Sequence, residues 1–586
     1  MSIIRRRRAA PRPHRFTENP LLQLALPAWR SRFVGLSLMF LFLLLLGTAF
    51  YQQVINNAFL QGEGNSRYRR DLEVSASRGK IADRNGDLLA ISAPMKSIWA
   101  IPADVKLEPA ARQNLAKLLE MEVKELDRRL ATEKGFVYLQ RQVAPEVAAR
   151  VAELKLSGIH QDGEFRRFYP AAEMVAHLVG FTGVDDKGLE GVELAFQNEL
   201  MGTPGHRTVI RDRRGQIVED VEHMRPPQDG RDIRLALDSK IQYLAFSAIK
   251  QAAAEYQAKA ISAVVLDART GEVLALANWP SYNPNNRANR FGPQLRNRAV
   301  TDSFEPGSTM KPFTVALALD KGRFRYDSLI DTGAGRLTIG NATISDTHAY
   351  GVLTVAQVIQ KSSNIGTVKI ASAFQPREMW DMYDALGFGS PLDLGFPGEV
   401  GGRLRPWKNW RPVEQATMSY GHGISVSLVQ LAHAYLAFAR DGDLVPLSLR
   451  LREADAPVRG AQIFSPQTAR EIRAMLEMVV APGGTAPRAQ VPGYRVGGKT
   501  GTAYKIEGGV YAQKYVASFV GIAPMSDPRL VVAVMVDEPT RQHYGGTVAA
   551  PVFAQITAGA LRTLGVAPDM SLQIAALPAN AAGVMP

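Results

Sequence analysis

The sequence predicts an α/β protein in which a membrane anchor and a mixed α+β module precede one large α/β domain. The chain has 586 residues, too many for a single core at about 150 residues per domain. Strand-like runs lie at both ends of residues 229–567, with helix-rich sequence between them. We therefore expect a sheet built from the two ends of that region. An uncharged apolar stretch near the N-terminus predicts the anchor.

The predicted anchor is Phe33–Tyr51, a run of 19 residues without charge. At a rise of about 1.5 Å per residue it spans about 28 Å, the thickness of a bilayer's hydrocarbon core. Residues 1–32 are rich in arginine, which predicts a cytoplasmic tail, a transmembrane segment over 33–54 and export of the rest. A signal peptide cleaved near Gly47–Ala49 is the alternative, but the apolar run is longer than the ~7–15 residues of a signal core.

The net charge of +13 is unevenly distributed. Residues 1–32 hold eight arginines against one glutamate and so contribute +7, which leaves +6 for all other residues. A nucleic-acid binder would carry its basic excess on a folded face, so this distribution argues against nucleic acid as a partner. The absence of cysteine excludes disulfides and thiolate chemistry, and it is compatible with an oxidising compartment.

Residues 55–228 are predicted to form a support or interaction module. The turn Asn85-Gly86 lies between alternating segments and predicts a hairpin, and a second hairpin is expected over His206–Val221. Residues 108–155 are rich in Ala, Leu, Glu and Lys and predict helix. The module shows no cluster of catalytic residue types.

Residues 229–567 predict the sheet and its covering helices. A short strand is followed by a helix that Asp238 and Ser239 open, and Ile261–Trp279 reads as two alternating strands around Thr270-Gly271. A helix-rich stretch follows from about 308 to 480. The later elements are three strands, at Tyr494–Lys505, Lys514–Pro524 and Arg529–Pro539, and a last helix, at Ala550–Gly565; residues 568–586 are expected to form a loose tail.

The segment Glu305–Phe313, with sequence EPGSTMKPF, offers two interpretations of Ser308. Serine is a favoured helix cap, but a capping box would place Glu or Gln three residues later, where this chain has Lys311. A lysine at a helix N-terminus is disfavoured by the dipole, which helps to lower its pKa. In a helix the two side chains share a face, so Lys311 can act as a base toward a nucleophilic Ser308.

Two further motifs follow in order. Ser362-Ser363-Asn364 places a hydroxyl and an amide on an expected loop, and Lys499-Thr500-Gly501 lies in a glycine-flanked strand where another backbone approaches closely. Each motif alone is weak. A second S-x-x-K at Ser77–Lys80 lies on a strand edge, and a second S-x-N at Ser281–Asn283 precedes Ser308, so we treat both as accidental.

Taken together, the three ordered motifs resemble the set shared by class A β-lactamases and penicillin-binding proteins. Residues 230–567 resemble the transpeptidase domain, a β-lactamase-like fold with an antiparallel sheet flanked by a helical subdomain. Ser363 stands where class A β-lactamases have Asp, which favours a class B penicillin-binding protein. The segments that resemble the class B pedestal are Arg78–Ala90, Arg167–Pro170 and Gly188–Leu200, and Ser97–Pro102 resembles the division-specific members.

The resemblance implies a serine D,D-transpeptidase without metal or organic cofactor. Ser308 would attack the D-Ala-D-Ala bond of a peptidoglycan stem peptide, Lys311 would take its proton, and Ser362 would relay a proton to the leaving D-Ala. An amine of a neighbouring stem peptide would then resolve the acyl-enzyme, whereas a β-lactam would remain bound. Asn364, Lys499, Thr500, Gly501 and Thr502 would bind substrate, with the backbone N–H groups of Ser308 and Thr502 around the oxyanion. His422, Trp407 and Arg411 receive no role.

The resemblance also implies a location and partners. The protein would lie in the bacterial cytoplasmic (inner) membrane with its catalytic domain in the periplasm, and it would work with a polytopic glycan polymerase and other divisome membrane proteins. An elongation-specific transpeptidase and a non-catalytic β-lactam receptor or scaffold are the alternatives. Such receptors usually have several membrane spans, and a β-lactamase would be a smaller soluble enzyme without the pedestal.

Overall fold

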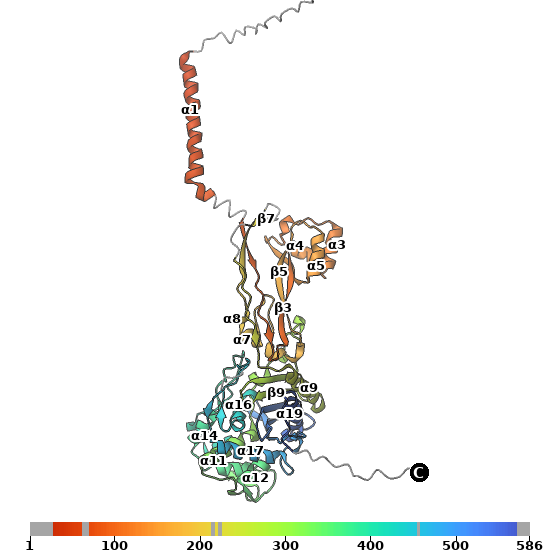
Figure 1. Ribbon diagram of the computed structural model, residues 1–586, viewed down its shortest axis with the longest axis vertical. Helices are drawn as coiled ribbons and strands as arrows, with labels where there is room; N and C mark the ends of the chain where they lie inside the picture. Colours follow the sequence, from red (N-terminus) through yellow and green to blue (C-terminus); the bar gives the residue numbers. More distant parts are fainter. Residues whose placement is uncertain (1–26, 61–68, 212–216, 221–224, 454–457, 571–586) are drawn as a thin grey trace, which may run out of the picture. The chain divides into compact units, whose positions relative to one another are not determined.

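The computed structural model describes residues 27–60, 69–211, 217–220, 225–453 and 458–570. Its contacts divide the chain into two compact units, one comprising 1–72 with 206–224 and the other 73–205 with 225–586 (Figure 1). Most of the expected cytoplasmic tail, 1–32, and most of the expected C-terminal tail, 568–586, lie outside the described residues.

The first unit holds the apolar helix. Helix α1 (Ala28–Phe50) continues into a π-helical turn η2 (Tyr51–Ile55), and together they are long and apolar enough to cross a membrane. The helix begins five residues before the predicted Phe33, directly after Pro27, so it includes two arginines. The strands β1 (Arg69–Val74), β6 (Gly205–Arg211) and β7 (Ile217–Asp220) form a sheet in the order β1-β6-β7. The β6–β7 pair confirms the second predicted hairpin, whose turn lies outside the described residues.

The pedestal in the second unit is built on a long strand, β3 (Leu88–Ala100). It pairs through the predicted Asn85-Gly86 hairpin with β2 (Ile81–Ala82), and Gly86 takes a φ of 96° there. On β3 also lie β4 (Val137–Val143) and β5 (Ile159–Phe168), and β8 (Ile233–Arg234) pairs with β2. The helices of this part are α3 (Pro109–Leu118), α4 (Val123–Leu130), α5 (Pro145–Glu153), α6 (Ala176–Val179), α7 (Gly191–Ala195) and α8 (Gln197–Leu200), with 3-10 turns η3 (Pro102–Asp104) and η4 (Ala172–Met174).

The helix predicted over residues 108–155 is confirmed by α3, α4 and α5 but is wrong at Val137–Val143. Strand β4 interrupts it, pairing antiparallel with β3, and its sequence VYLQRQV includes the β-branched and aromatic residues that favour strands. Leu139 of β4 and Ile98 of β3 are fully buried in a small core with α3, α4 and α5. Tertiary pairing with β3 therefore decides the conformation of this short segment.

A buried ionic cluster joins the pedestal segments that carried the family resemblance. Nε of Arg78 lies 2.6 Å from Glu193 Oε2, and Nε of Arg167 lies 2.7 Å from Glu193 Oε1. All three side chains are almost fully buried, so Arg78 belongs to the pedestal core. Lys80, in the S-x-x-K copy at Ser77–Lys80, is exposed, in contrast to the fully buried Lys311.

The large domain contains a five-stranded antiparallel sheet in the order β10-β9-β19-β18-β17. Its strands come from the two ends of the domain, as predicted. Every residue of β9 is buried, which differs from the expected alternation because helices cover both faces, α9 and α19 on one and α16 and α17 on the other (Figure 1). The bounds are β9 (Ala260–Asp267), β10 (Val273–Trp279), β17 (Gly497–Glu507), β18 (Val510–Ala523), β19 (Leu530–Asp537), α9 (Ser239–Tyr256), α16 (Leu428–Ala439), α17 (Pro466–Val480) and α19 (Ala550–Thr563).

A helical subdomain lies between the two groups of strands. Helix α11 (Lys311–Asp320) is its central element and packs against α13 and α17. The other helices are α10 (Arg298–Thr301), α12 (Val355–Lys361), α13 (Asn364–Ala371), α14 (Pro376–Ala385), α15 (Pro412–Ser419) and α18 (Gly545–Val548). The 3-10 turns are η5 (Arg287–Asn289), η6 (Pro293–Leu295), η7 (Gly307–Met310), η8 (Trp407–Asn409) and η9 (Pro487–Ala489). The short strands are β11 (Leu329–Asp331), β12 (Arg336–Ile339), β13 (Ala342–Ser345), β14 (Val352–Thr354), β15 (Asp443–Leu444) and β16 (Ala461–Gln462).

Strand β17 confirms the close backbone approach predicted from its glycines. A Cβ atom placed on Gly501 would lie 2.4 Å from Ser518 Oγ and 2.6 Å from the carbonyl oxygen of Pro306. Real Cβ atoms do not come so close, and a backbone oxygen cannot rotate away. Glycine at position 501 therefore allows β17 to contact the turn that precedes α11.

Replacing Gly501 with alanine should destabilise the protein by about 1–3 kcal/mol, the usual cost of overpacking a filled site. The measurement is the midpoint of thermal unfolding of the full chain. Gly163→Ala is the matched control because its added methyl meets no atom within 4 Å. Equal midpoints for both variants would contradict the close approach at β17.

Candidate active site

Ser308 lies in the 3-10 turn η7, immediately before α11. It is partly exposed, and Gly307 before it takes a φ of 57°. Neither η7 nor α11 receives a side-chain cap at its N-terminus, so Ser308 does not act as the helix cap. The partly exposed Ser308 therefore lies one turn before the buried Lys311.

Lys311 is the first residue of α11, and its side chain is completely buried. Its Nζ donates to the carbonyl oxygen of Ser362 at 2.5 Å and to Asn364 Oδ1 at 2.7 Å. It also lies 3.2 Å from Ser362 Oγ. The lysine thus connects the S-x-x-K motif to the S-x-N motif, as the ordered motifs predicted.

The S-x-N motif is a junction between two helices, where the sequence predicted a loop. Ser362 ends α12 in the left-handed conformation, with φ 59° and ψ 40°, and Ser363 caps α13 by accepting from the Gly366 N–H at 2.9 Å. The left-handed residue turns the chain sharply, so Ser362 and Asn364 both face Lys311. The Ser363 hydroxyl instead caps the N-terminus of α13.

Asp346, which was not among the predicted site residues, fixes the position of this junction. Its carboxylate accepts from Ser363 Oγ and from the Asn364 N–H, both at 2.5 Å, and from the Ile365 N–H at 3.1 Å. The side-chain amide of Asn364 donates to the Ser345 carbonyl at 2.9 Å. No local pattern marks an aspartate 16 residues before the motif as its partner.

Lys499 approaches the same serine from β17. Its Nζ donates to Ser362 Oγ at 2.9 Å and lies 3.3 Å from Thr500 Oγ1. Ser362 Oγ is therefore placed between two lysine side chains, and both lysines are fully buried. Thr500 Oγ1 is 3.2 Å from Thr485 Oγ1, and Thr502 Oγ1 accepts from the Gly545 N–H at 3.1 Å.

Burial lowers the pKa values of both lysines. Desolvation brings the pKa of Lys499 to about 7. Desolvation, and then repulsion by Lys499, hold the pKa of Lys311 well below its ordinary value, while the Asp346 carboxylate raises it. A neutral amine is consequently available near neutral pH, which is what a base beside a serine nucleophile requires.

Backbone contacts bring Ser308 and Thr502 to one place. A Cβ on Gly307 would lie 3.3 Å from the carbonyl oxygen of Thr502 and 3.6 Å from its nitrogen, and Gly501 contacts Pro306 in the same way. The two backbone N–H groups predicted to bind an oxyanion thus belong to segments in direct contact.

Three residues had no predicted role: His422, Trp407 and Arg411. His422 Nδ1 is 3.2 Å from Glu305 Oε2, a contact that joins the turn before Ser308 to the segment after α15. Trp407 packs against the domain core, and Arg411 is an exposed partner of Glu414.

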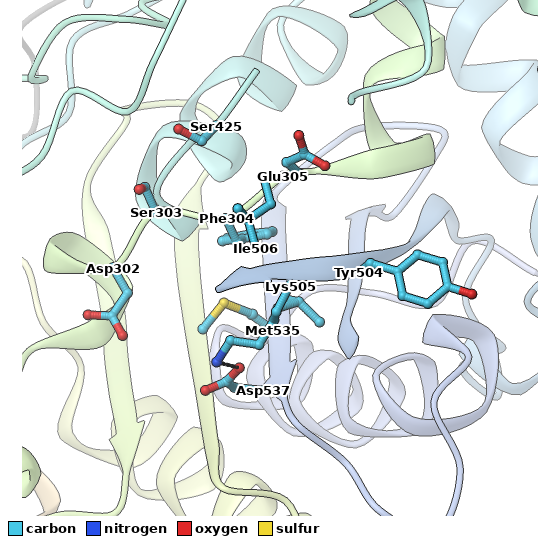
Figure 2. A pocket seen from close by; sticks show the side chains of 11 residues that line it. Asp302, Ser303, Phe304, Glu305, Ser425, Tyr504, Lys505, Ile506, Met535 and Asp537 are labelled. Atoms are coloured by element: carbon cyan, nitrogen blue, oxygen red, sulfur yellow. Dashed lines mark hydrogen bonds and ion pairs between the residues drawn. The ribbon is translucent and has the colours of Figure 1, made fainter. Parts of the chain in front are cut away.

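A cavity of about 270 Å³ lies beside the segment that leads to Ser308 (Figure 2). Ser308, Lys311, Ser362 and Lys499 do not line it. At one end Lys505 pairs with Asp537 at 2.8 Å. No group of three or more metal-ligating side chains is found within the described part of the chain. The lining residues are Asp302, Ser303, Phe304, Glu305, Ser425, Tyr504, Lys505, Ile506, Val516, Met535 and Asp537.

Comparisons with known proteins show which protein family the chain resembles. Residues 261–558 match the penicillin binding protein transpeptidase domain, and residues 73–235 match the penicillin-binding protein dimerisation domain. The chain is 45% identical over 555 residues to the probable peptidoglycan D,D-transpeptidase PenA of Neisseria gonorrhoeae, covering 94% of this chain and 95% of the relative. It is 41% identical over 551 residues to the peptidoglycan D,D-transpeptidase FtsI of Escherichia coli K12, covering 92% and 93%.

A solved structure of the transpeptidase domain of penicillin-binding protein 3 from Burkholderia pseudomallei is also similar. It is 54% identical and covers 57% of this chain and 98% of that chain, with a TM-score of 0.54. The antiparallel sheet with its helical subdomain is therefore the penicillin-binding transpeptidase fold that the sequence predicted.

The two buried lysines should titrate at depressed values. We expect Lys499 to titrate with a pKa of about 7, and Lys311 to titrate well below 10.5. Asp346→Asn should lower the pKa of Lys311 further, because it removes the negative charge that favours the ammonium. Side-chain NMR of labelled lysines, assigned with Lys→Arg variants, measures both values. Titration of Lys311 at its ordinary value would contradict the burial of that amine.

Proposed function

The chain belongs to the penicillin-binding protein family of peptidoglycan D,D-transpeptidases, and on that basis we propose that Ser308 is its acylated nucleophile. The observation that carries the proposal is the position of Ser362 Oγ between Lys311 and Lys499, next to the turn that presents Ser308. This arrangement supplies a neutral base, a proton relay and a cation within one buried network.

In the first half-reaction, Ser308 Oγ attacks the carbonyl carbon between the two terminal D-alanines of a stem peptide. Lys311 takes the hydroxyl proton, and the oxyanion lies between the backbone N–H groups of Ser308 and Thr502. Removal of one such donor typically costs about 3–4 kcal/mol of transition-state stabilisation. The contact between Gly307 and Thr502 supports this assignment.

The leaving group receives its proton through Ser362, which contacts both lysines. Asn364 binds a backbone amide of the substrate, and its own amide is fixed by Ser345. The terminal carboxylate of the donor binds at Lys499, Thr500, Gly501 and Thr502. D-Ala leaves, and an acyl-enzyme on Ser308 remains for the amine of a second stem peptide.

A β-lactam enters the same site as a mimic of D-Ala-D-Ala. Its carbonyl acylates Ser308, but the opened ring stays attached to the acyl group and no leaving group diffuses away. The retained ring therefore occupies the place of the departed D-Ala, which supports a long-lived adduct over rapid hydrolysis.

The domains have distinct proposed roles. Residues 229–567 carry the chemistry, residues 55–228 form a pedestal, and the apolar helix within 33–54 anchors the protein in the inner membrane. With the arginine-rich tail in the cytoplasm, the transpeptidase domain lies in the periplasm. The pedestal and the membrane helix are the proposed contacts for a polytopic glycan polymerase and other divisome proteins, since no proposed catalytic residue lies in them.

Ser308→Ala should abolish covalent labelling of the purified full chain by a fluorescent penicillin, because no other group is proposed to form the ester. Labelling is read after denaturing electrophoresis. Ser77→Ala, in the S-x-x-K copy of the pedestal, should label like the parent chain. Persistent labelling of Ser308→Ala would refute the nucleophile, and rapid release of label from the parent chain would favour a β-lactamase.

We propose that the protein acts in septum formation in the cell, because the chain resembles proteins named FtsI over most of its length. Cells depleted of the protein and supplied with Ser308→Ala should grow into filaments, as cells that elongate without dividing do. Microscopy of the depleted strain measures this. Rounded cells would favour the elongation-specific alternative, and normal division would favour a non-catalytic scaffold.

A further inference from the structure

His422 forms a carboxylate–imidazole pair beside the proposed nucleophile. Its Nδ1 lies 3.2 Å from Glu305 Oε2, and Glu305 is three residues before Ser308. Its side chain is 26% exposed, whereas that of Glu305 is only 7% exposed. Glu305 thus fixes one nitrogen of the imidazole, and the ring remains partly exposed.

Glu305 is fixed independently of the histidine. Its carboxylate accepts from the Gly423 N–H at 2.7 Å and from the Tyr511 hydroxyl at 3.1 Å. In Figure 2 this carboxylate points away from Met535, Lys505 and Asp537. Hydrogen bonds from His422 and Gly423 outweigh desolvation and lower the pKa of Glu305, so the group stays ionised. An ionised acceptor at Nδ1 fixes the tautomer in which Nε2 carries the free lone pair.

The loop that carries His422 lies directly against the nucleophile turn. The Gly307 N–H donates to the Gly421 carbonyl at 3.1 Å, and a Cβ on Gly421 would lie only 2.1 Å from the carbonyl oxygen of Gly307. The rings of Tyr420 and Tyr511 stand 5.4 and 6.3 Å from the imidazole. His422 therefore lies beside the turn that carries Ser308, on a different segment from the two buried lysines.

The second half-reaction needs one deprotonation that the first does not include, which converts the acceptor ammonium to a free amine. The attacking amine is an ammonium in water and has no lone pair until it loses a proton. Lys311 must deliver a proton to Ser308 at the end of the same step, so it is poorly suited to remove this one. A partly exposed imidazole with an orienting carboxylate has the chemistry for that transfer.

Resting on the proposed function, we propose that His422, oriented by Glu305, is the general base that deprotonates the acceptor amine. Nε2 takes one proton from the ammonium, and the freed lone pair forms the C–N bond to the acyl carbon. The tetrahedral intermediate then breaks its C–O bond to Ser308, and a second proton of the amine nitrogen reaches the serine oxygen through Lys311. The third stays on the new amide, and the imidazolium releases its proton to water.

The test separates acylation from aminolysis in the full chain. The donor is a soluble thioester analogue of the stem peptide, the acceptor is D-alanine, and mass spectrometry measures the amide product against the hydrolysis product. We expect His422→Gln to be acylated by fluorescent penicillin within about twofold of the parent rate. Amide formation should fall about 100-fold, the lower range for loss of a general base.

An acceptor that is already neutral gives the decisive comparison. Hydroxylamine is largely unprotonated at neutral pH, so it should restore product formation in His422→Gln and in Glu305→Gln. His543→Gln is the matched control, since its ring stacks on Tyr515 at 4.1 Å and is given no role in catalysis. Unchanged aminolysis, an equal fall in acylation, or no rescue by hydroxylamine would overturn the assignment. A parent chain that is not acylated would instead overturn the proposed function, and this inference with it.

Discussion

The site depends on one constraint, which is that two fully buried lysines share a single serine hydroxyl. Ser362 Oγ lies 3.2 Å from Lys311 Nζ and 2.9 Å from Lys499 Nζ. Burial lowers the pKa values of both lysines, and repulsion by Lys499 lowers that of Lys311 further. Because the fold buries both lysines, a neutral amine is available as a base near neutral pH. The left-handed Ser362 and the three hydrogen bonds of Asp346 fix the hydroxyl that joins them.

The fold meets this constraint by bringing three distant segments into backbone contact. Gly307, Gly421 and Gly501 each lie where a side chain would strike a neighbouring carbonyl or hydroxyl oxygen. The sheet makes this possible because its order, β10-β9-β19-β18-β17, places the C-terminal strands beside the N-terminal ones. Strand β17 thus lies at the sheet edge next to η7. Two features therefore bring these segments together: glycines at the contacts, and a sheet built from both ends of the domain.

The parts of this arrangement that carry a motif or a periodic pattern could be predicted, and the parts that rest on single unpatterned residues or on the pairing of one short strand could not. The motifs, the Asn85-Gly86 hairpin and the two-ended sheet follow from spacing and periodicity. Strand β4 was missed because its pairing with β3 outweighs its helical surroundings. Asp346 and the Glu305–His422 pair carry no local signal, since the partners are 17 and 117 residues apart in sequence. A resemblance in three short motifs supplied the identity of the site, whereas only the structure shows its electrostatics.

The lysine pair also links the binding of substrate to the strength of the base. With an empty site, the charge on Lys499 disfavours a proton on Lys311, which keeps Lys311 neutral but also makes it a weak proton acceptor. A donor carboxylate bound at Lys499, as proposed, compensates that charge. The proton affinity of Lys311 then rises, because the repulsion that lowered it is cancelled and Asp346 still favours the ammonium. A ligand with a carboxylate, such as D-Ala-D-Ala or a β-lactam, would therefore make Lys311 a stronger base for Ser308, although burial still keeps its pKa below the ordinary value.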